Sequence, residues 1–231
     1  MDDALLTLLR SVDTPTVCNA IETAQGQRGF NAFTHGTVLS SAPEAGAIVG
    51  YARTARIAAQ APSSDPADEV RARRLGYYRH MSEAECPAIA VVEDIDYPHA
   101  VGAYWGEVNT TVHKALGLAG ALTNGVMRDL GDLPDGFPVI AGSIGPSHAF
   151  VHVVDYAAGA RVFELDIAEG DLVHADRHGA LVIPPDVVGD LAAAIETLFR
   201  AERCILDPAR KGPMNFAEFE AAWAAFEQAR T

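Results

Sequence analysis

A series of short apolar runs, separated by turn residues, fills the chain from residue 138 to residue 183. Runs of this kind between Gly, Pro, Asn and Asp residues are typical of strands. They predict strands at 138–144, 149–154, 160–166, 172–174 and 180–183. Two β-rich runs nearer the N-terminus predict further strands at 46–58 and 87–92. Mixed strands bracketed by helices favour an α/β sandwich over a doubly wound parallel sheet.

Helices are predicted on both sides of these strands. Thr14 is suited to an N-cap and Pro15 to a first helical position, which predicts a helix start there. The Ala-rich C-terminal part predicts helices at 186–203 and 215–229. Because no repeat or linker divides the chain, we expect a single α/β domain over residues 1–205 and a C-terminal helical extension over residues 206–231.

Composition limits the classes of partner. The chain has 231 residues, of which 49% are hydrophobic and 21% charged, as in ordinary soluble proteins. Its formal net charge of −14 argues against a nucleic-acid partner, although a small basic pocket is compatible with it. No apolar run is long enough to span a membrane, and no signal peptide is evident. The widely spaced Cys18, Cys86 and Cys204 favour reduced thiols and a cytoplasmic location.

Two short segments, 106–109 and 128–132, carry the residues best suited to chemistry. Residues 107–117 are predicted to form a helix, and residues 118–122 a strand that runs back. A helix of about 11 residues rises roughly 16 Å, and a strand of five or six residues covers roughly 16–20 Å. We therefore expect Glu107 to meet the Arg128-Asp129 pair at one end of the sheet.

This arrangement is suited to binding an anionic small molecule. Gly106 precedes the helix, and the free backbone N–H groups of Glu107, Val108 and Asn109 would offer a seat for a carboxylate. Arg128 would add a bidentate contact to the same anion. A simpler alternative is that Glu107 only favours the helix dipole.

The acids of the second segment are candidates for a metal site. Asp129 offers a hard oxygen ligand for Mg²⁺ or Mn²⁺, which keep several waters and need few protein ligands. Asp132, three residues later, would hold one of those waters. The alternative is a surface ion pair between Arg128 and Asp129 of little consequence.

Other polar residues are predicted to have structural roles. The pairs His148/His152 and His174/His178 have a four-residue spacing, but HxxxH binds metal from a helix, and these segments read as strand and turn. We expect hydrogen-bonded histidines there. The acids at 93–96 follow a predicted strand and favour a solvated loop over a supporting role in a site.

The chain resembles the RraA-like family, which includes class II 4-hydroxy-4-methyl-2-oxoglutarate (HMG) aldolases and oxaloacetate decarboxylases. The matching stretches are DTPTVCNA at 13–20, VGYARTA at 49–55, WGEV at 105–108, TNGVMRDL at 123–130 and GDLVHADRHG at 170–179. The aldolase pattern is an acid, 20 residues, Arg-Asp, and an acid three positions later, which Glu107, Arg128, Asp129 and Asp132 fill. The departures are Glu107 and Asn124, where aspartate is common.

The resemblance implies a layered α-β-β-α sandwich of the swivelling-domain-like type, assembled as a homotrimer or a hexamer. It also implies a metal-dependent lyase that acts on a 2-oxo acid. HMG would be cleaved to pyruvate, or oxaloacetate decarboxylated, through a metal-stabilised enolate. In these roles Asp129 binds Mg²⁺ or Mn²⁺, Arg128 holds the substrate and stabilises the enolate, and Glu107 moves a proton through water.

The resemblance leaves two other functions open. Some RraA-like proteins are described as non-catalytic regulators that bind a ribonuclease, and others as demethylmenaquinone methyltransferase-like. Regulators tend to lack the complete set of acids, whereas this chain has Glu107, Asp129 and Asp132. Enol tautomerisation of a 2-oxo acid is a further alternative.

Overall fold

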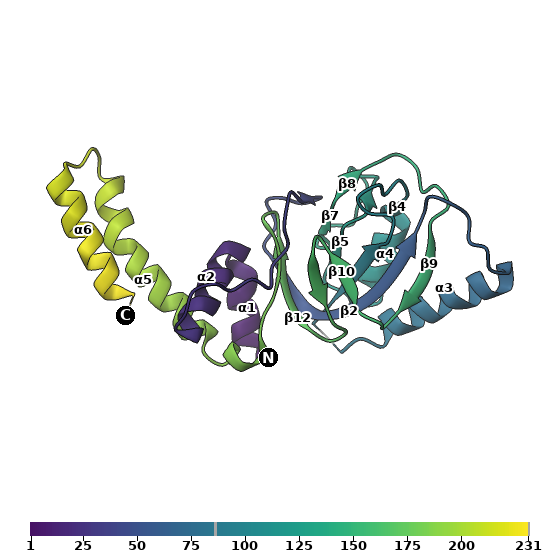
Figure 1. Ribbon diagram of the computed structural model, residues 1–231, viewed down its shortest axis with the longest axis horizontal. Helices are drawn as coiled ribbons and strands as arrows, with labels where there is room; N and C mark the ends of the chain where they lie inside the picture. The colour runs from purple at the N-terminus through teal and green to yellow at the C-terminus, as the bar shows by residue number, and fades with distance from the viewer. Residues whose placement is uncertain (86, 231) are drawn as a thin grey trace. The chain divides into compact units, whose positions relative to one another are not determined.

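The computed structural model describes residues 1–85 and 87–230, so Cys86 lies outside the described residues. The chain divides into two compact units (Figure 1). The larger unit comprises residues 9–14 and 32–183 and contains every strand named below. The smaller unit comprises residues 1–8, 15–31 and 184–230 and is helical.

An eight-stranded mixed sheet forms the centre of the larger unit. Its strand order is β1 (Leu39–Ser40), β7 (Val139–Ala141), β5 (Ala121–Thr123), β3 (Ala88–Asp94), β2 (Ile48–Ala58), β12 (Leu172–Asp176) and β13 (Gly179–Val182), and β9 (His152–Tyr156) also pairs with β2. The neighbours β2, β3, β5 and β7 are parallel, and the remaining pairs are antiparallel.

Two small sheets and two helices complete this unit. The three-stranded sheet is parallel and joins β4 (Ala103–Trp105), β6 (Val126–Met127) and β8 (Ser143–Ile144). The other is a hairpin of β10 (Ala160–Val162) and β11 (Leu165–Ile167). The helices are α3 (Ala67–Ser82) and α4 (Glu107–Ala115).

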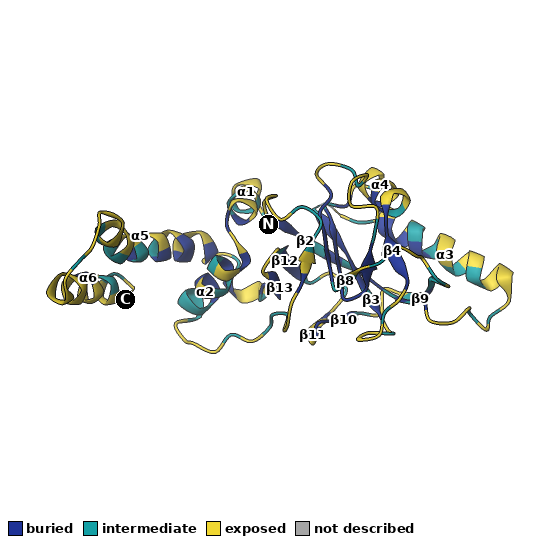
Figure 2. Ribbon diagram, turned by 90° about the horizontal axis from the view of Figure 1, so that it is seen from above, coloured by how far each residue is buried: buried dark blue, intermediate teal, exposed yellow. Residues whose placement is uncertain are grey.

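The main sheet is buried on both faces (Figure 2). Side chains alternate along β3, as they must in an extended strand. Ala88, Ala90 and Val92 pack in one apolar cluster with Tyr77 and Met81 of α3 and with Trp105 and Met127 of the small parallel sheet. Ile89 and Val91 pack in the other, with residues of the β10–β11 hairpin. This layered α/β architecture, with helices at the C-terminus, confirms the predicted fold class.

The smaller unit contains most of α1 (Asp3–Ser11) and α2 (Thr14–Gln25), the short 3₁₀ helix Pro185–Val187, α5 (Leu191–Arg210) and α6 (Phe216–Ala229). A capping box formed by Asn215 and Glu218 starts α6. Helix α5 continues without a break through residue 205, where the predicted domain was expected to end. None of the described helices is long and apolar enough to cross a membrane, and Cys18 and Cys204 are free thiols.

Most predicted strands are present, but those predicted at 138–144 and 160–166 are each divided into two strands, β7 and β8, and β10 and β11. The strand predicted at 149–154 is wrong in its first half. Residues 149–151 are not a strand, because the Val151 amide donates to the His148 carbonyl at 3.1 Å and closes a turn. Ala149 in this turn has a φ of 44°. The strand begins only at His152, so His148 and His152 do not lie at the two ends of a strand.

Candidate functional site

The segments 106–109 and 128–132 meet at one edge of the small parallel sheet. Strand β4 ends at Trp105 just before α4, and β6 ends at Met127 just before Arg128. Because β4 and β6 are parallel neighbours, their C-terminal ends lie at the same edge. The Arg128 amide donates to the Trp105 carbonyl at 2.8 Å, which fixes the register of the two segments.

The Asp129 carboxylate binds the start of α4. The Glu107 amide donates to Asp129 Oδ2 at 3.2 Å, so this carboxylate accepts one of the free N–H groups of the first helical turn. Asp129 has a φ of 56°, a left-handed conformation that aspartate tolerates better than most residues. The Asp132 amide donates to the Asp129 carbonyl at 2.9 Å and closes a turn that keeps both acids close in the chain.

Glycine at position 106 leaves room for the side chains of the second segment. A Cβ atom there would lie 2.5 Å from Asp129 Oδ2 and 2.9 Å from Arg128 Nε. The Gly106 carbonyl accepts the Thr110 amide at 3.0 Å and the Thr110 hydroxyl at 2.8 Å. The absence of a side chain therefore lets the second segment approach the helix start closely.

Arg128 is held near this carboxylate without being saturated by it. Its Nε lies 3.5 Å from Asp129 Oδ2, and the two side chains are 33% and 36% exposed. The Nε atom is buried and has no hydrogen-bond partner among the described residues. A buried donor without a partner is costly, so an anion bound beside Arg128 would satisfy it.

The predicted substrate-binding residues of α4 differ in what they can offer. Glu107 and Val108 are exposed, and their backbone N–H groups belong to the first helical turn. The Asn109 side chain is already used, because its Oδ1 accepts from the Tyr78 hydroxyl at 2.7 Å and its Nδ2 donates to the Tyr104 carbonyl at 2.6 Å. Only the backbone of Asn109 can contribute to an anion site.

A buried network of aromatic side chains holds α4, and the sequence analysis did not predict it. His113 Nδ1 donates to the Asn109 carbonyl at 2.5 Å, so its Nε2 accepts from the Tyr77 hydroxyl, also at 2.5 Å. Burial lowers the pKa of His113 to about 4, so the ring is neutral near pH 7. The available signal was His113 four residues after Asn109, a spacing that puts both on one face of the helix.

The acids fit a divalent cation that keeps most of its waters. Among the described residues, no three His, Cys, Asp or Glu side chains are arranged as a complete metal site. Mg²⁺ and Mn²⁺ do not need such a cluster, since one or two carboxylates are sufficient. Asp129 Oδ1 has no hydrogen-bond partner in the described part of the chain, and the Asp132 side chain is exposed. Both provide the hard oxygen ligands that these ions prefer.

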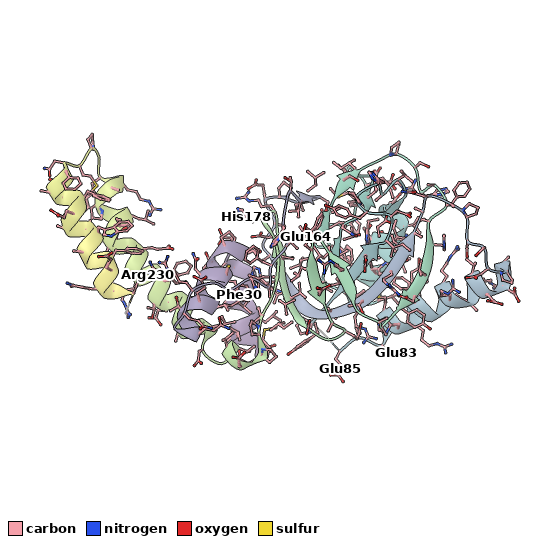
Figure 3. The ribbon with its side chains drawn as sticks, in the orientation of Figure 1. Phe30, Glu83, Glu85, Glu164, His178 and Arg230 are labelled. Carbon is pink, nitrogen blue, oxygen red and sulfur yellow. The ribbon has the colours of Figure 1, made fainter. Side chains whose placement is uncertain are left out.

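The histidines are hydrogen-bonded, as predicted. His148 and His152 bond the carbonyls of Ala149 and Phe150 through Nδ1 at 2.7 and 2.9 Å. The buried His174 contacts the Thr14 hydroxyl and donates to the Leu9 carbonyl. His178 lies in the exposed turn between β12 and β13 and contacts Asp176 (Figure 3).

The prediction of a solvated loop at residues 93–96 is wrong for Asp94. This side chain is fully buried at the end of β3, and its Oδ2 has no hydrogen-bond partner among the described residues. Burial raises the pKa of Asp94 to about 6. The Asp96 carboxylate is bonded within the protein, since it accepts hydrogen bonds from the amides of Ala59 and Gln60 at 2.6 and 2.9 Å. The Asp96 carboxylate therefore stabilises the loop.

Comparison with known proteins gives one family. The model of the RraA-like family, described as Aldolase/RraA, matches residues 14–182, which is more than half of the chain. No curated protein matches the sequence significantly.

Three solved structures have a similar fold. A protein from Pseudomonas syringae pv. tomato matches 100% of this chain and 94% of its own, with a TM-score of 0.67 and 18% identity. A protein reported among novel cellulases from gut-associated microbes matches over 88% of this chain and 87% of its own, with a TM-score of 0.70 and 20% identity. RraAS2 of Streptomyces coelicolor, an unusual member of the RNase ES inhibitor RraA family, matches over 88% of this chain and 94% of its own. Its TM-score is 0.63 and its identity is 21%. At these identities the likeness concerns the fold alone.

Proposed function

Because the chain belongs to the RraA-like family, we propose that the residues which meet at the start of α4 make it a divalent-metal-dependent carbon–carbon lyase acting on a 2-oxo acid. The observation that carries this proposal is the hydrogen bond of 3.2 Å from the Glu107 amide to Asp129, beside an Arg128 Nε that lacks a partner. It supports the proposal because the first turn of α4, a guanidinium and a carboxylate lie close together.

The substrate carboxylate would bind at the first turn of α4. Free N–H groups at a helix start attract anions, and Arg128 adds a positive charge from the opposite side. In a chain with a net charge of −14, such a local cationic site is needed to hold an acidic substrate.

The cation would be held by Asp129 directly and by Asp132 through a water molecule. Bound Mg²⁺ or Mn²⁺ would supply Lewis-acid polarisation of the 2-oxo group. Arg128 would stabilise the negative charge that develops on the oxo oxygen when the C3–C4 bond breaks.

For HMG, the proton of the C4 hydroxyl leaves, the C3–C4 bond breaks, and its electron pair forms the enolate of pyruvate; the other half is released as a second pyruvate. Glu107, which is exposed at the mouth of the site, would take the hydroxyl proton through water and return a proton to C3. For oxaloacetate, the same enolate forms when CO₂ leaves, so both reactions use the same residues.

Assembly would place this site near a subunit boundary. RraA-like proteins are generally trimers or hexamers. Three large apolar side chains around the site are exposed in the single chain, Val108 at 71%, Leu130 at 43% and Ile144 at 54%. We propose that a neighbouring subunit covers this apolar rim, and light scattering coupled to size exclusion would give the number of subunits.

The function is tested by measuring pyruvate release from HMG and from oxaloacetate. Activity should require Mg²⁺ or Mn²⁺, stop on addition of EDTA, and fall by on the order of 100-fold or more in Asp129→Ala. Asp135→Ala, which removes another exposed acid from the same loop, is the matched control and should keep full activity.

Full activity of Asp129→Ala would refute the assigned site. An inactive wild-type chain that binds a ribonuclease in a pull-down would instead support the regulator function.

A further inference from the structure

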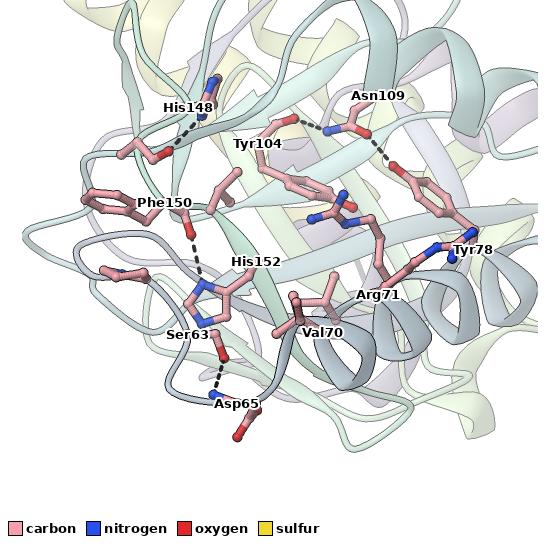
Figure 4. A pocket seen from close by; sticks show the side chains of 16 residues that line it. Ser63, Asp65, Val70, Arg71, Tyr78, Tyr104, Asn109, His148, Phe150 and His152 are labelled. Atoms are coloured by element: carbon pink, nitrogen blue, oxygen red, sulfur yellow. Dashed lines mark hydrogen bonds between the residues drawn. The ribbon is translucent and has the colours of Figure 1, made fainter.

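A pocket lies in the larger unit, next to α4, and of the residues assigned above it includes only Asn109 (Figure 4). Its volume of about 770 Å³ is in the range of small-molecule sites. It lies between the N-terminal half of α3, the turn at 148–151 and the start of β9, and Tyr104 and Asn109 close its inner end. Glu107, Arg128 and Asp129 are not among its lining residues.

The pocket has an excess of positive charge. Arg71 and Arg74 lie on successive turns of α3, and neither forms an ion pair with any described residue. The one acid that lines the pocket, Asp65, is already paired with Arg73 at 2.8 Å. Two unpaired arginines beside a neutralised acid make a local anion-attracting surface, although the whole chain carries a net charge of −14.

The remaining lining is largely apolar. Val70, Val151 and Val153 line the pocket, together with Phe150, whose side chain is 57% exposed. Figure 4 shows the Arg71 side chain extending toward the ring of Tyr104, while Phe150 lies at the opposite side. A ligand that contacts both sides therefore needs a charged end and an apolar body.

The inner wall is preorganised. The Tyr78 hydroxyl donates to Asn109, which donates to the Tyr104 carbonyl, so these side chains are fixed before a ligand enters. His148 and His152 are fixed in the same way by their Nδ1 bonds to backbone carbonyls. With these groups of the wall occupied, the two unpaired arginines are the charged groups left to recognise an anion.

We propose that this pocket binds a small organic carboxylate with an apolar body, of the size of an aromatic acid. Its carboxylate contacts Arg71 and Arg74, and its body packs against Phe150 and the valines. This site does not depend on the proposed lyase activity, since it shares only Asn109 with the residues assigned to the reaction, and neither arginine belongs to them.

Calorimetric titration of the full chain in metal-free buffer tests the proposal, with benzoate as the probe and benzamide as its neutral counterpart. Benzoate should bind and benzamide should bind at least about tenfold more weakly, because only the carboxylate makes charge-assisted contacts. The double variant Arg71→Ala/Arg74→Ala should weaken benzoate binding by about tenfold or more.

Arg79→Ala is the matched control, since it removes an exposed arginine of the same helix that does not line the pocket. It should leave benzoate binding unchanged. Phe150→Ser should weaken the binding of benzoate. Acetate, which lacks the apolar body, should bind to the wild-type chain more weakly than benzoate does. Equal affinity for benzoate and benzamide, unchanged affinity in the double variant, or no benzoate binding would each overturn the proposal.

Discussion

Two of the arginine–carboxylate pairs in the larger unit differ in how many bonds they make with other protein groups. Arg128 and Asp129 are a third exposed, lie 3.5 Å apart, and leave the arginine Nε without a partner. Arg53 and Glu169 are closer, at 2.9 Å, and are less exposed, at 21% and 27%. Arg53 Nε and Glu169 Oε1 also lack hydrogen-bond partners among the described residues, but the second pair makes more bonds with other protein groups than the first.

The second pair links three elements of the fold. Glu169 Oε2 accepts both the amide and the hydroxyl of Thr54 at 2.7 Å, and His80 Nε2 lies 3.4 Å from Oε1. Arg53 donates to His80 Nδ1 at 2.8 Å and to the His80 carbonyl. Burial alone would raise the pKa of Glu169, but the hydrogen bonds from His80 and Thr54 lower it to about 2. The pair with several protein partners, called the saturated pair below, stabilises the fold. We expect the other, called the unsaturated pair, to be available to a ligand.

The largest expected effect is on activity at the unsaturated pair. Arg128→Ala should lower pyruvate release on the order of 100-fold, because a group that stabilises developing charge is lost. Its free energy of unfolding should change by less than about 0.5 kcal/mol, since no close partner is lost. Steady-state kinetics and urea unfolding measure the two quantities. A loss of stability above about 2 kcal/mol would contradict the contrast between the pairs.

Glu169→Gln should show the opposite behaviour. It leaves Arg53 partly buried without a counter-charge, so the free energy of unfolding should fall by about 2–3 kcal/mol, while activity per folded molecule stays close to wild type. Glu164→Gln is the control, because Glu164 (Figure 3) is 66% exposed and, among the described residues, its ion pair is with His35. That variant should lose less than about 0.5 kcal/mol. Equal unfolding free energies of Glu169→Gln and Glu164→Gln would contradict the structural role of Glu169.

Acid should weaken the saturated pair selectively. The pKa of Glu169 in the folded chain, about 2, lies below its ordinary value of 4.5. Its contribution of about 2–3 kcal/mol is therefore complete above pH 4.5 and is lost as the pH falls toward 2. The difference in unfolding free energy between wild type and Glu169→Gln should shrink over this range. A difference that is independent of pH would show that charge does not carry the effect.

The smallest effect concerns a third carboxylate, which is buried with no cation beside it. The pKa of Asp94 is raised from 3.8 to about 6, so its ionised form destabilises the fold above pH 6. Asp94→Asn should therefore raise the free energy of unfolding by about 1 kcal/mol at pH 7.5, and the gain should disappear below pH 3.8. Thermal unfolding at both pH values measures this, and a variant less stable at pH 7.5 would contradict it.

The sequence predicts these features unequally. The proximity of Glu107 and Asp129 depends on one short helix and one short return, so element lengths are enough to expect it. The contact between Thr54 and Glu169 joins residues 115 positions apart, and no local pattern selects that partner. The strand predicted at 149–151 fails because Phe150 and Val151 favour strands, whereas the turn at Ala149 is set by tertiary contacts such as the Phe150 amide donating to Ala59.

The bond from Glu107 to Asp129 has a consequence for the order of events at the start of α4. An amide hydrogen serves one strong acceptor at a time, and in the single chain that acceptor is Asp129 Oδ2. An external carboxylate that takes this hydrogen must displace Asp129. The Asp129 carboxylate thus occupies the position of an external one: while it stays, the Glu107 amide is taken, and when it leaves, an acid oxygen is released for another partner in the same step.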